Sequence, residues 1–235
     1  MAAWDGYLRA IKSEYQESPG IFLRKPTISR CLHPNQGSVG KGYWQNVKGK
    51  YNIKDPAHGA PHICIDGMSS NSIQHIYYID QMDYYWKNTK FDHILEIGGG
   101  YGNGCRIWKA YGHTGSYTIC DFKEMNFIQS QYLEKVSDLN NVSFAQLDNC
   151  YFKRPNSLLQ AAFSINEMPL ETRALIEPHY RDYENIFIVH NRKFDGIDNI
   201  EYFKNLKEEL SDEYNVQHFP CPIYGLAWFF IAKRK

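Results

Sequence analysis

Residues 94–104 read ILEIGGGYGNG, an apolar stretch with one acid that runs directly into a glycine-rich loop. Glycine occupies every even-numbered position from 98 to 104. Because glycine has no side chain, such a loop lets backbone N–H groups approach a ligand where a strand ends and a helix begins. A tight turn that binds nothing would need only one or two of these glycines. The stretch therefore predicts a strand, a ligand-binding turn and a helix, with a purely structural turn as the alternative.

Two common phosphate-binding loops do not fit this stretch. A nucleoside-triphosphate loop requires lysine and then serine or threonine after its last glycine, whereas Gly104 is followed by Cys105 and Arg106. A dinucleotide fingerprint, counted from Gly98, would need glycine at the position that Asn103 occupies. The ligand is therefore expected to belong to another class.

Outward from the loop, short apolar runs alternate with helical patterns from Phe91 to the C-terminus. This alternation is typical of an α/β doubly wound sheet. Only a short loop or a single turn fits between the third and fourth strands. No helix fits between the last two strands, so we expect five parallel strands followed by a C-terminal antiparallel hairpin. The seven expected strands are 93–97, 116–121, 142–147, 158–165, 185–190, 214–219 and 226–232, and the expected helices are 102–111, 123–136, 170–183 and 199–210.

The first ninety residues follow a different pattern. Helical periodicity predicts helices over 4–16 and 71–86, and the second helix has Ser69, Ser70 and Asn71 as candidate caps. The segment between them is rich in glycine, proline, histidine and asparagine, which indicates an irregular cap or lid. We therefore predict an N-terminal cap over 1–90 and a sheet domain over 91–235.

The composition bears on partners and location. Lysine plus arginine and aspartate plus glutamate each number 26, without long blocks of one sign, so a nucleic-acid partner is not expected. The charged N-terminus lacks the apolar stretch of a secretory signal or membrane span, so we expect a cytoplasmic protein without a membrane partner. The six cysteines form no C-x-x-C pair and are expected to be free thiols.

A metal site is not predicted. The side chains that could bind zinc do not have a recognised zinc spacing, because Gly59 and Pro61 prevent the helix that would align two of them. Asp195 and Asp198 could support magnesium, but two acids beside a glycine are more typical of a turn. The zinc candidates are Cys31, His33, His58, His62 and Cys64.

The order apolar, apolar, Glu, apolar, Gly-x-Gly-x-Gly over residues 94–102 resembles the first motif of class I S-adenosylmethionine-dependent methyltransferases. In that family the loop passes under the amino-acid part of the cofactor, and the strand acid orients its ammonium group. The resemblance therefore implies that Glu96, Gly98, Gly100 and Gly102 bind S-adenosylmethionine (SAM), with S-adenosylhomocysteine (SAH) as the product.

Further cofactor contacts follow from the same resemblance. Asp121 ends the next strand, where the family places a carboxylate on the ribose hydroxyls, and Phe122 beside it could pack on the adenine. Asp148 follows the third strand and could accept from the adenine amine, although an acid there is also common as a helix cap. Ser164, near the end of the fourth strand, completes the expected set.

The segments AFSINEMP (162–169) and IVHNRK (188–193), together with the glycine loop, resemble the sugar O-methyltransferase family over most of 91–235. The resemblance implies methyl transfer to a hydroxyl of a sugar or glycan precursor, with a sugar or nucleotide-sugar as the small-molecule partner. The sequence leaves the oligomeric state open, with a homodimer as one alternative. Two other functions remain open, namely methylation of a phenol or amine and SAM or SAH binding without catalysis.

Transfer to a sugar hydroxyl requires a general base, because the hydroxyl is a poor nucleophile at neutral pH. Glu167 follows the fourth strand and His190 ends the fifth, and the carboxyl ends of these strands border the cleft of an open α/β sheet. We therefore expect these two residues to be catalytic. In the alternative, Glu167 caps the following helix and His190 satisfies a backbone group.

Overall fold

The computed structural model describes residues 2–32, 40–87 and 90–235, so His33 lies outside the described residues. Its backbone forms two compact units, which are described separately below. The sheet unit comprises Lys90–Gly99, Gly115–Asp121 and Asn141–Lys235. The helical unit comprises Met1–Thr89, Gly100–Thr114 and Phe122–Asn140.

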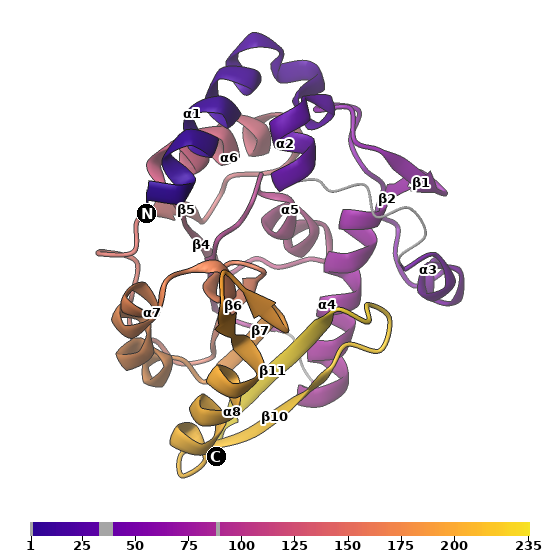
Figure 1. Ribbon diagram of the computed structural model, residues 1–235. Coiled ribbons are helices and arrows are strands. Elements are labelled where there is room, and N and C mark those ends of the chain that lie inside the picture. The colour runs from indigo at the N-terminus through magenta and orange to yellow at the C-terminus, as the bar shows by residue number, and fades with distance from the viewer. Residues whose placement is uncertain (1, 33–39, 88–89) are drawn as a thin grey trace. The chain divides into compact units, whose positions relative to one another are not determined.

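The sheet unit contains seven strands in the order β10-β11-β7-β6-β3-β4-β5 (Figure 1). All neighbouring pairs are parallel except those of β11, which runs antiparallel to both β10 and β7. The predicted five parallel strands and C-terminal hairpin are confirmed, and the hairpin places β11 inside the sheet and β10 at its edge. The strands are β3 (His93–Ile97), β4 (Ser116–Cys120), β5 (Val142–Ala145), β6 (Ser157–Ala162), β7 (Asn185–Asn191), β10 (Tyr214–Pro220) and β11 (Ala227–Arg234).

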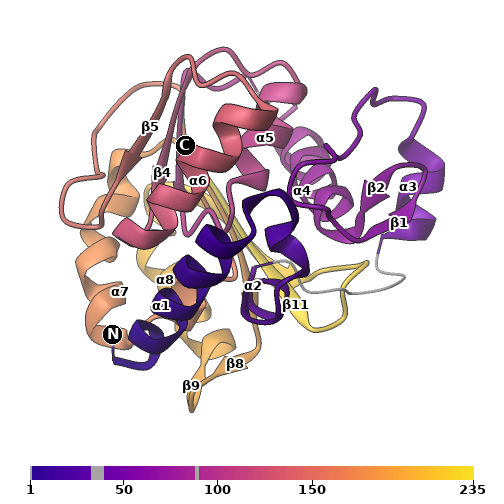
Figure 2. The same cartoon turned by 90° about the horizontal axis from the view of Figure 1, so that it is seen from above.

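One face of this sheet is covered by helices α7 (Leu170–Ile176) and α8 (Asn199–Leu210) (Figure 2). Leu95 and Ile97 of β3 face these helices within the main apolar core. Because side chains alternate along a strand, Glu96 between them faces the opposite side of the sheet. This alternation separates the apolar core from the polar side chains of the candidate site.

Several predicted elements of the sheet unit end earlier than expected: β4 by one residue, β5 at Ala145 instead of residue 147, and β6 and the following helix by more. β6 stops at Ala162, because Phe163 adopts a positive φ of 56° and residues 165–167 form the 3₁₀-helix η2 (Ile165–Glu167). The helix predicted over 170–183 divides into α7 and the 3₁₀-helix η3 (Glu177–Asp182). Pro178 explains the division, since proline lacks the N–H that would continue the α-helical ladder. No helix lies between β5 and β6, as predicted.

The helical unit combines the N-terminal segment with α5 (Asn103–Ala110) and α6 (Lys123–Val136). α4 (Ser70–Trp86) packs against α5, and α1 (Ala2–Glu17) packs against α6. Ser69 caps α4, as predicted, since its hydroxyl accepts a hydrogen bond from the N–H of Ser72 at 3.2 Å. Short elements that the sequence pattern did not predict precede α4: η1 (Pro19–Arg24), α2 (Pro26–Cys31), α3 (Lys41–Val47) and the hairpin of β1 (Ile63–Ile65) and β2 (Met68–Ser69).

Among the described residues, no helix has both the length and the apolar composition needed to cross a membrane.

Candidate functional site

The carboxyl ends of β3 and β4 bring Glu96 and Asp121 together in the sheet unit. Ile97 pairs with Cys120 in the parallel register, so Asp121 follows directly after the residue beside Ile97. Glu96 is 3% exposed and accepts a hydrogen bond from the hydroxyl of Tyr117 at 2.9 Å. Burial, opposed by the hydrogen bond from Tyr117 and assisted by the negative charge of Asp121, raises the pKa of Glu96 to about 7. The two carboxyl groups therefore interact electrostatically.

A chain of hydrogen bonds between buried side chains fixes the orientation of Glu96. Gln160 of β6 donates from Nε2 to the Tyr117 hydroxyl at 2.6 Å, and Tyr117 in turn donates to Glu96. Every polar atom in this chain comes from a buried side chain of a parallel strand. The orientation of Glu96 is consequently determined by the sheet itself and not by a mobile loop.

Gly98 makes room for a neighbouring side chain. It has a φ of 75°, and a Cβ placed on it would lie 2.2 Å from the Cβ of Ser164. The Ser164 hydroxyl donates to the carbonyl oxygen of Ile97, and the N–H of Gly98 donates to the carbonyl oxygen of Cys120 at 2.9 Å. Gly98 and Ser164, both predicted to bind cofactor, thus contact each other at the end of β3. That prediction remains untested.

The other two glycines of the predicted motif belong to the helical unit and have different surroundings. Gly102 precedes α5 with a φ of 96°, and a Cβ on it would lie 3.2 Å from Leu133 of α6. Gly100 has a φ of 56°, and a Cβ on it would meet no atom of the described residues within 4 Å. Its carbonyl oxygen accepts a hydrogen bond from Gln129 at 3.0 Å. At Gly100, unlike Gly98 and Gly102, the absent side chain therefore leaves open space.

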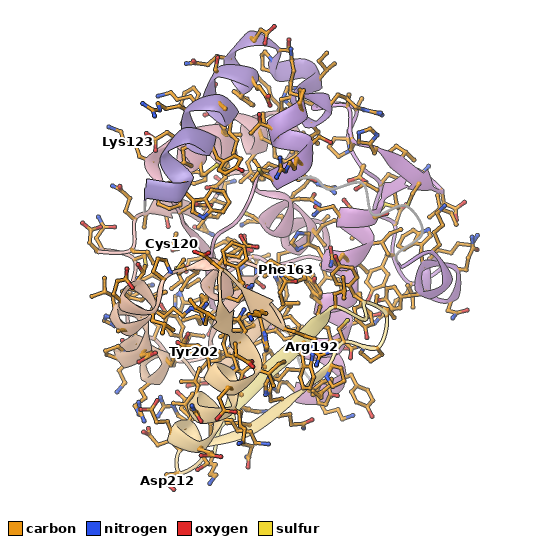
Figure 3. All side chains as sticks on the ribbon, viewed as in Figure 1. Cys120, Lys123, Phe163, Arg192, Tyr202 and Asp212 are labelled. Carbon is orange, nitrogen blue, oxygen red and sulfur yellow. The ribbon has the colours of Figure 1, made fainter. Side chains whose placement is uncertain are left out.

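The predicted adenine contacts lie in different units. Phe122 precedes α6 in the helical unit, and its ring lies at a tilt against Trp4 of α1, with centroids 6.5 Å apart. Asp148 is exposed in the loop after β5 in the sheet unit. The pKa of the Cys120 thiol is raised by its hydrogen bond to Cys150, by burial, and by the charges of both Asp121 and Asp148. Asp121 and Asp148 therefore share the surroundings of Cys120, a free thiol at the end of β4 (Figure 3).

Glu167 lies at the end of η2 and is partly exposed. Burial raises the pKa of its carboxyl to about 7, within the range useful for a general base near neutral pH. The helix that follows begins at Leu170 with Pro169 as its N-cap, so the capping alternative for Glu167 is not supported. Its placement is compatible with a role in proton transfer.

Arg173 holds the backbone on both sides of Glu167, and the sequence analysis missed it. Its Nη2 donates to the carbonyl oxygen of Asn166 at 2.6 Å, and its Nε donates to the carbonyl oxygen of Met168 at 2.9 Å. The side chain is fully buried, and its guanidinium lies 4.6 Å from the ring centroid of Tyr202. An arginine in an amphipathic helix is ordinarily solvent-exposed, so no sequence signal indicated this role.

His190 occupies the interior of the sheet unit. It is fully buried, its Nδ1 lies 3.0 Å from the carbonyl oxygen of Asn191, and its Nε2 lies 2.9 Å from Nε2 of His218. Its ring stacks on Phe203 of α8 with centroids 4.1 Å apart. Burial lowers the pKa of His190 to about 3. This geometry favours the alternative in which His190 satisfies a backbone group, although its catalytic role has not been tested.

The two acids considered for magnesium, Asp195 and Asp198, have structural roles in a turn and a helix cap. Asp195 and Gly196, with φ values of 45° and 83°, form the turn of the hairpin β8 (Lys193–Phe194) and β9 (Ile197–Asp198). Asp198 caps α8 by accepting from the N–H groups of Ile200 and Glu201. Within the described ranges, no three His, Cys, Asp or Glu side chains are grouped so that they could hold a metal ion.

Comparison with known proteins identifies the fold. No protein-family model and no curated protein matches the sequence. The methyltransferase domain of bacterial CtHen1 aligns with a TM-score of 0.53 over 70% of this chain and 98% of its own, at 8% identity. The glycopeptide N-methyltransferase MtfA aligns with a TM-score of 0.52 over 67% of this chain and 94% of its own, at 10% identity.

A third structure, magnesium protoporphyrin IX methyltransferase from Synechocystis PCC 6803 with bound SAH, aligns with a TM-score of 0.50 over 70% of this chain and 84% of its own, at 13% identity. At such identities the similarity concerns the fold alone. Together with the strand order and the single reversed strand β11, it assigns the chain to the Rossmann-like methyltransferase fold.

Proposed function

We propose that this protein is an S-adenosylmethionine-dependent methyltransferase that methylates a hydroxyl of a sugar or glycan precursor. The observation that carries the proposal is the pair of carboxyl groups, Glu96 and Asp121, at the ends of adjacent strands of a methyltransferase-type sheet, directly before and beside a glycine loop. The balanced charge of the chain supports a small-molecule acceptor over a nucleic acid.

The residues present suit the chemistry of SAM. The electrostatic interaction of Glu96 with Asp121 marks a region of negative potential, which favours the ammonium and sulfonium groups of the cofactor. Asp121 would accept hydrogen bonds from the ribose hydroxyls, because an ionised carboxylate acts as an acceptor at both oxygens. The open space at Gly100 would let the loop backbone approach the amino-acid part of the cofactor.

Glu167 is the residue that we assign to the acceptor hydroxyl. When bound, SAM supplies an electrophilic methyl carbon. Glu167 would take the hydroxyl proton onto a carboxylate oxygen, a step favoured by its pKa of about 7. The assignment to a sugar hydroxyl rests on the resemblance of 162–169 and 188–193 to sugar O-methyltransferases, and the phenol and amine acceptors remain the alternatives to be tested.

Calorimetric binding of SAH tests the cofactor assignment. We expect the wild-type protein to bind SAH and expect Glu96→Ala and Asp121→Ala each to weaken binding at least about tenfold, which is about 1.4 kcal/mol. Asp212→Ala, which removes an exposed carboxylate of the same unit, is the matched control and should bind SAH normally (Figure 3). Unchanged affinity in both site variants would refute the assignment.

A panel of acceptors tests the rest of the proposal. Formation of SAH from SAM is measured with sugars, nucleotide-sugars, phenols and amines, and we expect turnover with a sugar hydroxyl. Glu167→Gln should reduce kcat by about 10²- to 10⁴-fold without weakening SAH binding, because a general base contributes a factor of this size. Turnover with an amine or phenol alone would exclude the sugar acceptor, and tight SAH binding without turnover on any acceptor would favour a binding protein.

A further inference from the structure

Asn71, near the start of α4, contacts the glycine loop within the helical unit. Its Oδ1 accepts hydrogen bonds from the hydroxyl of Tyr101 at 3.1 Å and from Nδ2 of Asn103 at 2.7 Å. Tyr101 lies between Gly100 and Gly102, and Asn103 is the first residue of α5. A single side-chain oxygen from the N-terminal segment therefore accepts hydrogen bonds from two residues, one in the loop and one at the start of the helix that follows it.

A buried polar network supports this contact from behind. Asn103 also donates to the hydroxyl of Ser72 at 3.0 Å and accepts at Oδ1 from Nε of Arg106 at 2.8 Å. Arg106 pairs with Asp55 at 2.7 Å, and their side chains are only 5% and 1% exposed. Breaking this ion pair would leave a buried charge without its partner and destabilise the fold. The α4 and α5 helices that carry the network lie side by side in both views (Figures 1 and 2).

The loop needs such an anchor because of its own composition. Gly100 and Gly102 have φ values of 56° and 96°, and glycine populates many other conformations about as readily. Tyr101 between them is 2% exposed, and its ring packs against Tyr132 with centroids 5.1 Å apart. Fixing the Tyr101 side chain at its hydroxyl therefore restricts the backbone on both sides of it, including the N–H groups of Gly100 and Gly102.

We propose that Asn71 is a positioning residue for the cofactor loop, through its hydrogen bonds with Tyr101 and Asn103. This inference rests on the proposed function, since it takes the loop to be the one that binds SAM. Asn71 acts through the loop and contributes to affinity by lowering the conformational freedom that binding would otherwise remove. The N-terminal segment is thereby part of the binding apparatus, although it lies far from the loop in the sequence.

The test compares a substitution that removes the acceptor oxygen with one that retains it. Asn71→Ala removes the acceptor for both donors, and we expect it to weaken SAH binding about tenfold. Asn71→Asp keeps a carboxylate oxygen for both donors near the positive end of α4, so its affinity should stay within about twofold of wild type. Hydrogen exchange in the ligand-free protein should show faster exchange of the amides at residues 100–103 in Asn71→Ala only.

Asp80→Ala is the matched control on the same helix. The Asp80 carboxylate accepts from the hydroxyls of Tyr43 and Tyr51 and pairs with Lys50 at 2.7 Å, so its loss disturbs the N-terminal segment without touching the loop. We expect normal SAH affinity in this variant. Equal losses in Asp80→Ala and Asn71→Ala would reduce the effect to general destabilisation and overturn the inference.

Two further outcomes separate this inference from the proposed function. If wild-type protein binds SAH and Asn71→Ala binds it equally well, or if Asn71→Asp loses as much affinity as Asn71→Ala, the positioning role is wrong and the cofactor assignment stands. If the wild-type protein and the Asp212→Ala control both fail to bind SAH, the proposed function fails and the positioning role fails with it.

Discussion

Arg173 donates hydrogen bonds to the backbone on both sides of Glu167. The two carbonyl oxygens to which its guanidinium donates belong to Asn166 and Met168, the residues immediately before and after the proposed base. The guanidinium lies against the ring of Tyr202, whose hydroxyl donates to Glu177 at 2.8 Å. Burial lowers the pKa of Arg173, and the negative charge of Glu177 opposes that shift. Glu167 itself is not bonded to Arg173, so the arginine acts on the backbone that carries the carboxyl group.

Replacing Arg173 should change the acidity of Glu167 in a direction that reveals this role. In Arg173→Met the segment 166–168 loses both bonds, so the Glu167 carboxyl gains access to water and its pKa should fall from about 7 toward 4.5. Simple removal of a positive charge would raise the pKa instead. NMR titration of carboxyl-labelled protein measures the direction.

Two variants accompany that titration. Arg173→Lys retains a donor for one carbonyl oxygen and should give an intermediate pKa, which also covers the case in which Arg173→Met fails to fold. Arg181→Met removes an exposed arginine that pairs with Glu213 at 2.8 Å and should leave the pKa of Glu167 unchanged. A rise in the pKa of Glu167 in Arg173→Lys or Arg173→Met would contradict the positioning role.

Binding of SAH should depend on the protonation of Glu96. With a pKa of about 7 in the ligand-free protein, Glu96 must lose its proton to attract the ammonium group of the ligand. Affinity should therefore rise as pH increases from 6 to 8, with proton release near pH 7 that calorimetry in two buffers of different ionisation enthalpy can count. Glu96→Gln should bind more weakly and without this pH dependence. A wild-type affinity that does not vary over this range would count against the assignment of Glu96.

The sequence was most informative where local periodicity and turn chemistry determine structure. β3, α6 and α8 have the predicted boundaries, because in each case the alternating or helical apolar pattern ends at residues typical of turns or helix ends. β6 and α7 are shorter than predicted. The apolar run at the end of β6 does not reveal the positive φ of Phe163, and the helical pattern after α7 does not reveal the effect of Pro178. The grouping of α5 and α6 with the N-terminal segment depends on long-range contacts, which no local pattern encodes.

The residues of the candidate site likewise fall into those that the sequence could predict and those whose surroundings depend on long-range contacts. Glu96 and Asp121 could be proposed from sequence because residues 94–102 resemble the methyltransferase motif, which implies a second carboxylate at the end of the next strand. The burial of His190 could not be proposed, because it depends on α8 and on His218 from another strand. The network around Asn71 was equally hidden, since its donors and acceptors come from segments far apart in the chain.

Alanine substitutions at Gly98 and Gly100 should affect different properties, stability for Gly98 and SAH binding for Gly100. Gly98→Ala would place a methyl group 2.2 Å from the Cβ of Ser164, so we expect a marked loss of stability, partly restored by adding Ser164→Gly. Gly100→Ala meets no described atom within 4 Å, so its cost is the strain of a positive φ, about 1 kcal/mol, while SAH binding should weaken strongly. Thermal unfolding and calorimetry measure the two properties. Tight SAH binding by a folded Gly100→Ala would contradict the role of the open loop position.

Acid stability should reveal the structural role of His190 and His218. Burial lowers the pKa values of these residues to about 3 and about 4, whereas the unfolded chain takes up their protons near 6.5. The stability that they contribute is therefore present above about pH 6.5 and is lost as pH falls toward 4. In urea unfolding, replacing both residues with leucine should flatten this loss, whereas His179→Leu, which changes a histidine that is 37% exposed, should leave it as in wild type. The double variant should also retain SAH binding and, near pH 7.5, a kcat within a few-fold of wild type. A kcat lowered by about 10² or more in a folded double variant would restore His190 as the general base.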